Sequence, residues 1–181
     1  AGQLLQAKGI HYSLAELACH NHLDKFNGGQ FATIYLAPHN YHRLHLPVDG
    51  QLTATTAVPG ELFSVNSATA AGVRNLFGRN ERLVCHFDTA AGEMLVVLVG
   101  ALIVASIEAV WPEAASPYQH ISRQQFARNA YRFNKGDEIG RFLLGSTVIV
   151  CFEAAAAQWQ PELKAGQTVR MGEAIGQISP R

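Results

Sequence analysis

The chain has 181 residues, 48% of them hydrophobic and 15% charged, which is enough to bury the core of one globular domain and leaves little room for a second. Its 14 basic and 14 acidic residues give a formal net charge of zero, which excludes a basic surface for nucleic acid and a polybasic signal for an anionic membrane. Three scattered cysteines are too few for a disulfide framework and fit a reducing compartment.

The first part of the chain predicts short strands around one short helix. Residues 3–8 form a candidate strand, and since no signal-peptide pattern opens the sequence, we expect the chain to begin within a domain. Ser13 and Glu16 make a capping box, which predicts a helix over residues 14–23. A further strand is expected over residues 30–36.

The middle of the chain predicts antiparallel β structure. Residues 51–58 alternate like a strand, and a Pro-Gly turn leads them back into a second strand over residues 61–65. A short helical or irregular connection over residues 68–77 precedes a strand at 82–87. The apolar stretch at 94–110 holds about fourteen consecutive residues of membrane-like character, fewer than the ~20 of a span, and predicts one long or two consecutive buried strands.

The last third combines a polar excursion with the most apolar strand. Residues 112–136 are predicted to form a surface excursion, and residues 142–150 a buried strand. Residues 163–176 have the glycine spacing of the half-barrel in biotinyl and lipoyl carrier domains, but the attachment lysine is missing. The predicted fold is therefore α+β, predominantly antiparallel β-sheet with a barrel-sandwich-like core and a few short helices.

One pair of small residues is unusual in the predicted strand at 142–150. Glycine inside a strand weakens it and marks a bulge or a close backbone approach, so Gly145 and Ser146 on their own favour a structural interpretation. The sequence has no Gly-x-Ser-x-Gly elbow between a strand and a helix here, which argues against an α/β-hydrolase.

Two histidines in one short motif are candidates for acid-base chemistry. His42 and His45 would point to opposite faces of an extended segment, and would converge if the chain bends at Arg43.

A zinc site is the other chemistry that the residues suggest. Thiolate and imidazole are its preferred ligands, but no Cys-x-x-Cys pair exists and a helix would spread the first three candidates around its axis. We therefore expect no metal, and packing or surface roles for Cys19, His20, His22, Cys85 and His86.

Several motifs together resemble one known family. Leu-Leu-Gly-Ser-Thr-Val-Ile at 143–149 and Tyr-His-Arg-Leu-His-Leu-Pro at 41–47 are similar to motifs of the bacterial, pyruvoyl-dependent phosphatidylserine decarboxylases. Residues 3–9, 75–82 and 99–110 match in the same order, so the resemblance covers nearly the whole chain.

The resemblance implies a self-processing lyase. The Ser146 hydroxyl would attack the carbonyl of Gly145, and an N-to-O acyl shift, β-elimination and hydrolysis would leave a pyruvoyl group at residue 146. A single decarboxylase domain would thus become a β chain of residues 1–145 and an α chain of residues 146–181. His45 would be the processing base, and His42 the proton donor in a decarboxylation through a Schiff base.

The resemblance also implies partners and a location. The substrate would be phosphatidylserine and the product phosphatidylethanolamine, made in phospholipid biosynthesis by a zymogen-derived enzyme. The enzyme would lie peripherally on the cytoplasmic face of the bacterial inner membrane, with its β and α chains associated and with no nucleic acid. The resemblance leaves the oligomeric state open, with a homodimer as one alternative.

The sequence departs from the family pattern in its first part. Family members carry an aspartate in a Pro-x-Asp-Gly segment before the stretch that matches residues 6–9, and an N-terminal region that docks on the membrane; this chain starts after both. Asp49 follows the histidines and is no positional match. We expect the polypeptide as written to cleave slowly or not at all, and a rapid, complete split on a denaturing gel would contradict this.

Two other functions remain open at this level. A pyruvoyl-dependent decarboxylase of a soluble amino acid would share the Gly-Ser chemistry, and a non-enzymatic barrel-sandwich binding module would share the C-terminal glycine pattern. The mass of the purified protein separates a binding module, with one chain, from either enzyme, with two.

Overall fold

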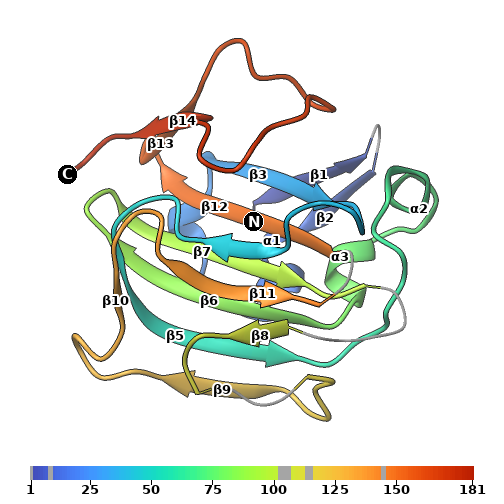
Figure 1. Ribbon diagram of the computed structural model, residues 1–181, viewed down its shortest axis with the longest axis horizontal. Helices are drawn as coiled ribbons and strands as arrows, with labels where there is room; N and C mark the ends of the chain where they lie inside the picture. Colours follow the sequence, from blue (N-terminus) through green and yellow to red (C-terminus); the bar gives the residue numbers. More distant parts are fainter. Residues whose placement is uncertain (1, 8–9, 102–106, 113–115, 144–145) are drawn as a thin grey trace.

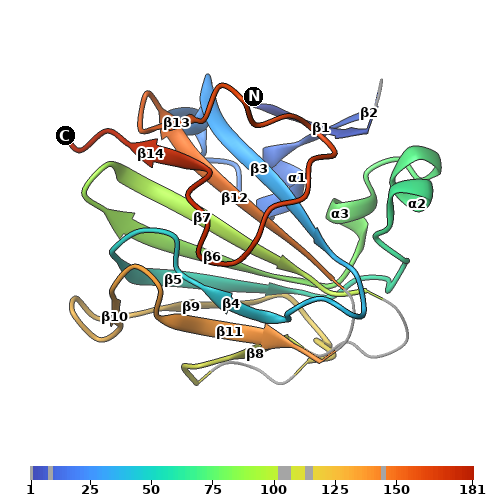
Figure 2. The ribbon, with the colours of Figure 1, turned by 45° about the horizontal axis from the view of Figure 1, so that its top comes forward.

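The computed structural model describes residues 2–7, 10–101, 107–112, 116–143 and 146–181. A seven-stranded sheet forms the middle layer, a three-stranded sheet covers one of its faces, and the N-terminal hairpin with the helices covers the other (Figures 1 and 2). The paired strands are antiparallel, which confirms the predicted α+β class with mainly antiparallel sheet. In the described residues the strands do not close into a barrel.

The main sheet has the strand order β10-β5-β6-β7-β12-β3, with β9 also paired to β5. Its long strands are rich in β-branched and apolar residues, as buried strands are. They are β5 (Gly50–Val58), β6 (Arg82–Thr89), β7 (Gly92–Val99), β12 (Ser146–Ala154) and β3 (Gly29–Leu36), with the short β9 (Ser122–Gln125) and β10 (Arg132–Phe133) at the β5 edge.

The three-stranded sheet, with order β4-β11-β8, forms the second layer. Its strands are β4 (Arg43–His45), β11 (Glu138–Phe142) and β8 (Ile107–Ala109). Two exposed ion pairs tie neighbouring strands together: Arg43 Nη1 lies 2.8 and 2.7 Å from the two carboxylate oxygens of Glu138, and Arg141 Nε lies 2.6 Å from Glu108.

The other face of the main sheet is covered by the hairpin of β1 (Gln3–Ala7) and β2 (Ile10–Ser13) and by short helices. The helices are α1 (Leu14–Ala18), the 3-10 turn η1 (Asp24–Phe26), α2 (Ser67–Gly72) and α3 (Leu76–Arg79). All the helices in the described residues are too short to cross a membrane. A final hairpin joins β13 (Ala157–Trp159) to β14 (Gly176–Ile178).

The main sheet separates two apolar cores, because alternate residues of a strand face opposite sides. On β12, Val148, Val150 and Phe152 pack toward the three-stranded sheet. Ile149 and Cys151 pack toward the hairpin and helices. We call these the inner core and the helical core respectively.

Several sequence predictions need correction in the first half of the chain. The helix predicted over residues 14–23 ends at Ala18, because Cys19 takes a left-handed conformation with φ 51°. The Ser13 hydroxyl does cap this helix, accepting a hydrogen bond from Ala15 N at 3.1 Å. Residues 61–65 form no strand: Glu61 makes only an isolated bridge to Asn80, so the predicted hairpin is wrong.

The second half also differs from the prediction. Residues 112–136 are not only a surface excursion, since they contribute β9 and β10 to the main sheet. Residues 142–150 are not one strand: Phe142 ends β11 in one sheet and Ser146 begins β12 in the other. Residues 160–175 contain turns in place of the strand-turn-strand unit, and the paired strands flank them.

Candidate active site at the junction of the two sheets

Ser146 lies where the chain passes from the three-stranded sheet to the main sheet. It is the first residue of β12, and it pairs with Leu36 of β3. Leu144 and Gly145, the second of which carries the predicted cleavage bond, lie outside the described residues. Ser146 is therefore at a strand end between two layers, not inside a strand as its sequence context indicates.

The hydroxyl of Ser146 is buried and has no hydrogen-bond partner in the described residues. The residue is 0% exposed, and its Oγ meets no donor or acceptor among the described residues. The same holds for Oγ1 of the neighbouring Thr147. Leaving a buried polar group unpaired costs about 1–3 kcal/mol, so each such group needs an explanation, which a catalytic role, a bound ligand or an ordered water can supply.

His42 lies directly beside the end of β11. Its carbonyl accepts a hydrogen bond from Phe142 N at 3.0 Å, which continues the ladder between β4 and β11. Its Nδ1 lies 2.5 Å from the carbonyl oxygen of Asn40, and a carbonyl can only accept, so Nδ1 carries the proton. In the neutral ring Nε2 then has a free lone pair, and this atom is buried without a partner in the described part of the chain.

His45 has both ring nitrogens engaged. Nδ1 donates to the carbonyl of Gly136 at 2.7 Å, and Nε2 lies 2.7 Å from the Tyr41 hydroxyl. The two rings stack with their centroids 5.7 Å apart. Because Nδ1 holds the proton, the neutral Nε2 accepts from Tyr41, and that hydroxyl has to be displaced or shifted before His45 can act as a base.

The two histidines face different sides of the three-stranded sheet. The backbone is extended over β4, so of the two predicted arrangements the one with the histidines on opposite faces is correct, and the chain does not bend at Arg43. Leu44 packs in the inner core, and His42, two residues before it, faces the same side. His45 faces the outer side together with the exposed Arg43. On β12, Ser146 shares the alternation of Val148 in the inner core. His42 and Ser146 therefore both face the layer between the sheets.

A buried glutamate close to this junction was not singled out from the sequence. Glu81 is 2% exposed, and its carboxylate accepts hydrogen bonds from the Ser116 hydroxyl and from Tyr118 N, the latter at 2.7 Å. The sequence offered two signals: Glu81 is a charged residue directly before the apolar strand β6, and it lies in the stretch 75–82 that resembles the family. Its importance depends on its neighbours across the sheet.

Two other reactive side chains, one beside the junction and one in the middle of β12, have structural roles. Arg82 is buried on the helical side, where it donates to the carbonyls of Glu16 and Leu17 at 2.8 and 2.6 Å, and burial lowers its pKa to about 10. Burial raises the pKa of the Cys151 thiol to about 12, so this cysteine is a poor nucleophile.

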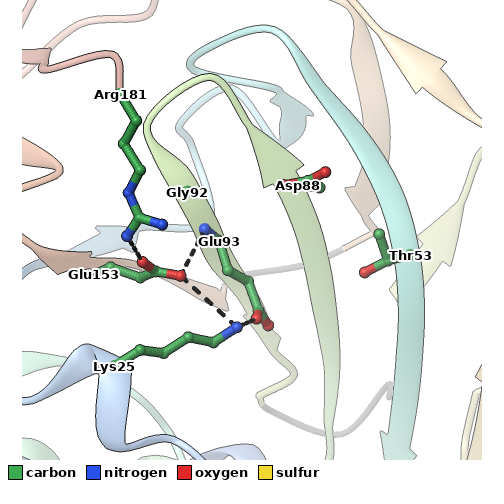
Figure 3. Close-up of a pocket in the computed structure, with 7 residues that line it drawn as sticks. All are labelled: Lys25, Thr53, Asp88, Gly92, Glu93, Glu153 and Arg181. Atoms are coloured by element: carbon green, nitrogen blue, oxygen red, sulfur yellow. Dashed lines mark hydrogen bonds and ion pairs between the residues drawn. The ribbon is translucent and has the colours of Figure 1, made fainter.

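A second polar cluster lies at the opposite end of β12. Figure 3 shows Glu153 between Lys25 and Arg181, with Glu93 on the neighbouring strand. Glu153 also accepts from Glu93 N at 2.9 Å, and His86 Nδ1 lies 2.5 Å from Glu93. Burial acts to raise the pKa of Glu93, but His86 and Lys25 together bring it below its ordinary value. These charges neutralise one another and leave no reactive group, so we interpret the cluster as structural.

The residues considered for zinc are only partly brought together. The His20 ring lies 5.7 Å from that of His22 and 6.1 Å from that of His86, measured between centroids. No group of three metal-binding side chains in the described residues is arranged to hold an ion.

Comparison with known proteins identifies what this chain is similar to. A family model described as phosphatidylserine decarboxylase matches residues 1–177. A phosphatidylserine decarboxylase proenzyme of Methylococcus capsulatus is 50% identical over 178 residues, which cover 96% of this chain and 62% of that protein. Proenzymes of the same name from Yersinia pestis and Yersinia pseudotuberculosis are 50% identical over 187 residues, covering 99% of this chain and 64% of theirs. The chain thus spans slightly less than two thirds of these relatives.

Proposed function

The chain belongs to the phosphatidylserine decarboxylase family, and we propose that it converts phosphatidylserine to phosphatidylethanolamine with a pyruvoyl group formed from its own Ser146. The observation that carries the proposal is the fully buried Ser146 hydroxyl, which has no partner among the described residues and faces the same layer as Nε2 of His42, an atom that likewise has none there. A nucleophile without a partner and a free basic nitrogen are costly for the fold and useful for chemistry.

Self-cleavage would use Ser146 as the nucleophile. Its Oγ bonds to the carbonyl carbon of Gly145, the peptide C–N bond breaks, and the nitrogen of residue 146 leaves as an amine that takes up the hydroxyl proton. Loss of the Cα proton of residue 146 then breaks the Cβ–O bond of the ester, which frees the β chain at the Gly145 carboxylate. Water replaces the nitrogen of residue 146, which departs as ammonia, and the α chain begins with the pyruvoyl group.

The surroundings of residue 146 suit such a group. The position is fully buried beside inner-core residues, and its polar atom has no competing partner in the described residues. When present, the pyruvoyl group supplies a carbonyl that links to the substrate amine and accepts the electron pair left by departing carbon dioxide.

We assign the proton transfer in the decarboxylation to His42. The Asn40 carbonyl fixes the proton of Nδ1 at 2.5 Å, so Nε2 is the nitrogen that takes up and delivers protons on the inner side. For self-cleavage the family motif assigns the base to His45, whose Nε2 accepts from Tyr41. His45 lies on the outer side of β4 and Ser146 on the inner side, so this step requires the β4 segment to rearrange as well as Tyr41 to leave Nε2 or relay the proton.

A peripheral position on the cytoplasmic face of the inner membrane belongs to the same proposal. Three large hydrophobic side chains near the junction are exposed, with fractions of 57% for Leu143, 51% for Tyr41 and 44% for Tyr35. Such side chains can contact lipid while the headgroup enters the site.

The test is the mass and activity of the protein at its natural length. We expect two chains split at Gly145–Ser146, a C-terminal chain that reacts with hydroxylamine, and carbon dioxide release from phosphatidylserine in mixed micelles. One chain of full mass would favour the binding module. Release from a free amino acid, with none from phosphatidylserine, would favour the soluble-substrate decarboxylase.

A further inference from the structure

Glu81, Gly100 and Ser146 lie in one row across the end of the main sheet, as the pairing of the preceding row shows. Val99 pairs with Arg82 on one side and with Thr147 on the other. The next row therefore contains Glu81, Gly100 and Ser146, and Gly100 N donates to the Glu81 carbonyl at 2.9 Å. Neighbouring strands are ~4.8 Å apart, so Gly100 sits between Ser146 and Glu81 at about one strand spacing from each.

This row faces the inner core. Side chains in one row point to the same face, and the preceding row, with Val99 and Arg82, points to the helical side. Three observations agree: Val148 shares the alternation of Ser146, Tyr118 beside Glu81 belongs to the inner core, and Ile107 of that core lies next to Gly100. Gly100 thus leaves a gap in the side-chain row, on the side where Ser146 and His42 face.

No contact within the described residues requires glycine at position 100. A Cβ placed there would lie 3.5 Å from the Glu81 carbonyl oxygen, 3.8 Å from Leu62 Cδ2 and 3.9 Å from Ile107 Cδ1, which are ordinary van der Waals distances, and φ is not positive. At Gly29, Gly60 and Gly140, by contrast, a Cβ would come within 2.0–2.6 Å of backbone oxygen. A buried glycine costs conformational entropy, so one without a steric reason marks a place where something else approaches.

We propose that Gly100 is a specificity-determining position, and that the space it leaves receives the carboxyl group of the substrate's amino-acid headgroup. The inference rests on the proposed function and names the substrate group bound there. In a substrate linked through its amine to residue 146, the carboxyl carbon is two bonds from the linking nitrogen. It can therefore reach the neighbouring strand at Gly100. The walls provided by Leu62 and Ile107 are apolar and suit a group that leaves as neutral carbon dioxide.

The neighbours of Gly100 complete the assignment. His42 Nε2 takes up a proton that the substrate ammonium releases when its nitrogen becomes linked to residue 146. When the bond between Cα and the carboxyl carbon then breaks, carbon dioxide departs, the electron pair stays on the amine-linked side, and that proton passes from Nε2 to Cα. Glu81 lies beyond the space, held by Ser116 and Tyr118.

The test is Gly100→Ala in the full-length protein, with Gly72→Ala as the matched control, since a Cβ at Gly72 meets no atom within 4 Å. Both variants are made in a His42→Ala background, which slows loss of the carboxyl group, and borohydride trapping of short-chain phosphatidylserine and phosphatidylethanolamine on the C-terminal chain is followed by mass. The two lipids differ only in the carboxyl group. In Gly100→Ala we expect half-maximal adduct formation to need about tenfold more phosphatidylserine, because one methyl group in a pocket changes discrimination between substrates by about 10–200-fold. The concentration of phosphatidylethanolamine that gives half-maximal adduct should stay unchanged.

Each other outcome overturns the inference. Equal effects on both lipids, or none on either, would place the carboxyl group elsewhere. Failure of Gly100→Ala to fold or to cleave would mean that the glycine is structural. If the unmodified protein forms no adduct with either lipid, the proposed function fails and this inference with it.

Discussion

The two ends of β12 differ in whether their buried polar groups have partners in the described residues. At its C-terminal end the buried carboxylate of Glu153 is contacted by Lys25, Arg181 and the Glu93 amide (Figure 3). At its N-terminal end the hydroxyls of Ser146 and Thr147 have no partner in the described part of the structure. Paired groups stabilise the fold, whereas unpaired ones persist only where surrounding packing holds them. The comparison separates the stabilising end of the strand from the end suited to chemistry.

The largest effect is expected from Ser146→Ala at the unpaired end. The variant should give one chain of full mass and no carbon dioxide release, because nucleophile and pyruvoyl source are both removed. It should unfold at the same or a higher urea concentration than an uncleaved chain that keeps Ser146, since the substitution removes a buried hydroxyl that has no partner in the described residues. Intact mass and urea unfolding measure both, and a variant that still splits would contradict the assignment.

His42→Ala should separate the two reactions. We expect cleavage to proceed and decarboxylation to fall by about 10²-fold or more, the usual size of a general acid-base contribution. Single-turnover carbon dioxide release is the measurement, with His22→Ala as an exposed histidine control. An active His42→Ala enzyme would refute the proton-transfer role.

Tyr41→Phe should affect cleavage without affecting the fold. The change removes the donor to His45 Nε2 and leaves the stacked ring, so the exposed ring should keep its packing. We expect the cleavage rate to change by several fold while decarboxylation by the matured enzyme stays constant. An unchanged rate would mean that this hydrogen bond has no part in processing.

Glu153→Gln tests the paired end. Losing the charge that Lys25 and Arg181 contact should cost about 2 kcal/mol of unfolding free energy, the size of a hydrogen bond to a charged group. Urea unfolding should register this loss, and the fraction of cleaved chain should not change. A larger effect on cleavage than on stability would mean that the two ends of β12 are coupled.

The smallest effect concerns pH. The pKa of Glu93 is lowered in the folded state, so its stabilising contribution is complete above the ordinary carboxyl pKa of 4.5 and is lost as pH falls through the lower folded value. Stability should therefore decline below about pH 4.5, and Glu93→Gln should flatten that part of the curve. Thermal unfolding between pH 3 and 7 provides the measurement.

Much of the fold was predictable from local patterns. Alternation and β-branched residues predicted the strands now seen as β3, β5 and β6, and the serine cap predicted the start of α1. The break of residues 142–150 into β11 and β12 could not be predicted, because both halves have the same strand propensity. The predicted strand at residues 61–65 failed for the related reason that a strand also needs a partner at its edge.

The candidate site divides in the same way. The serine and the histidine motif are visible in the sequence, since their residue types and spacing belong to one family. The outward position of His45 depends on which face of β4 packs on the main sheet. The relation of Glu81, Gly100 and Ser146 depends on the register of three strands that are far apart in the chain.

By itself, the sequence determined which residues can react and which segments form strands, because hydroxyl, imidazole and β-branched side chains have those properties wherever they occur. Only the tertiary structure decided that Ser146 begins a strand between two layers, that His42 shares its side, and that Gly100 leaves space beside it. The physical reason is that burial, pairing and register arise from contacts between distant segments, which no local pattern specifies.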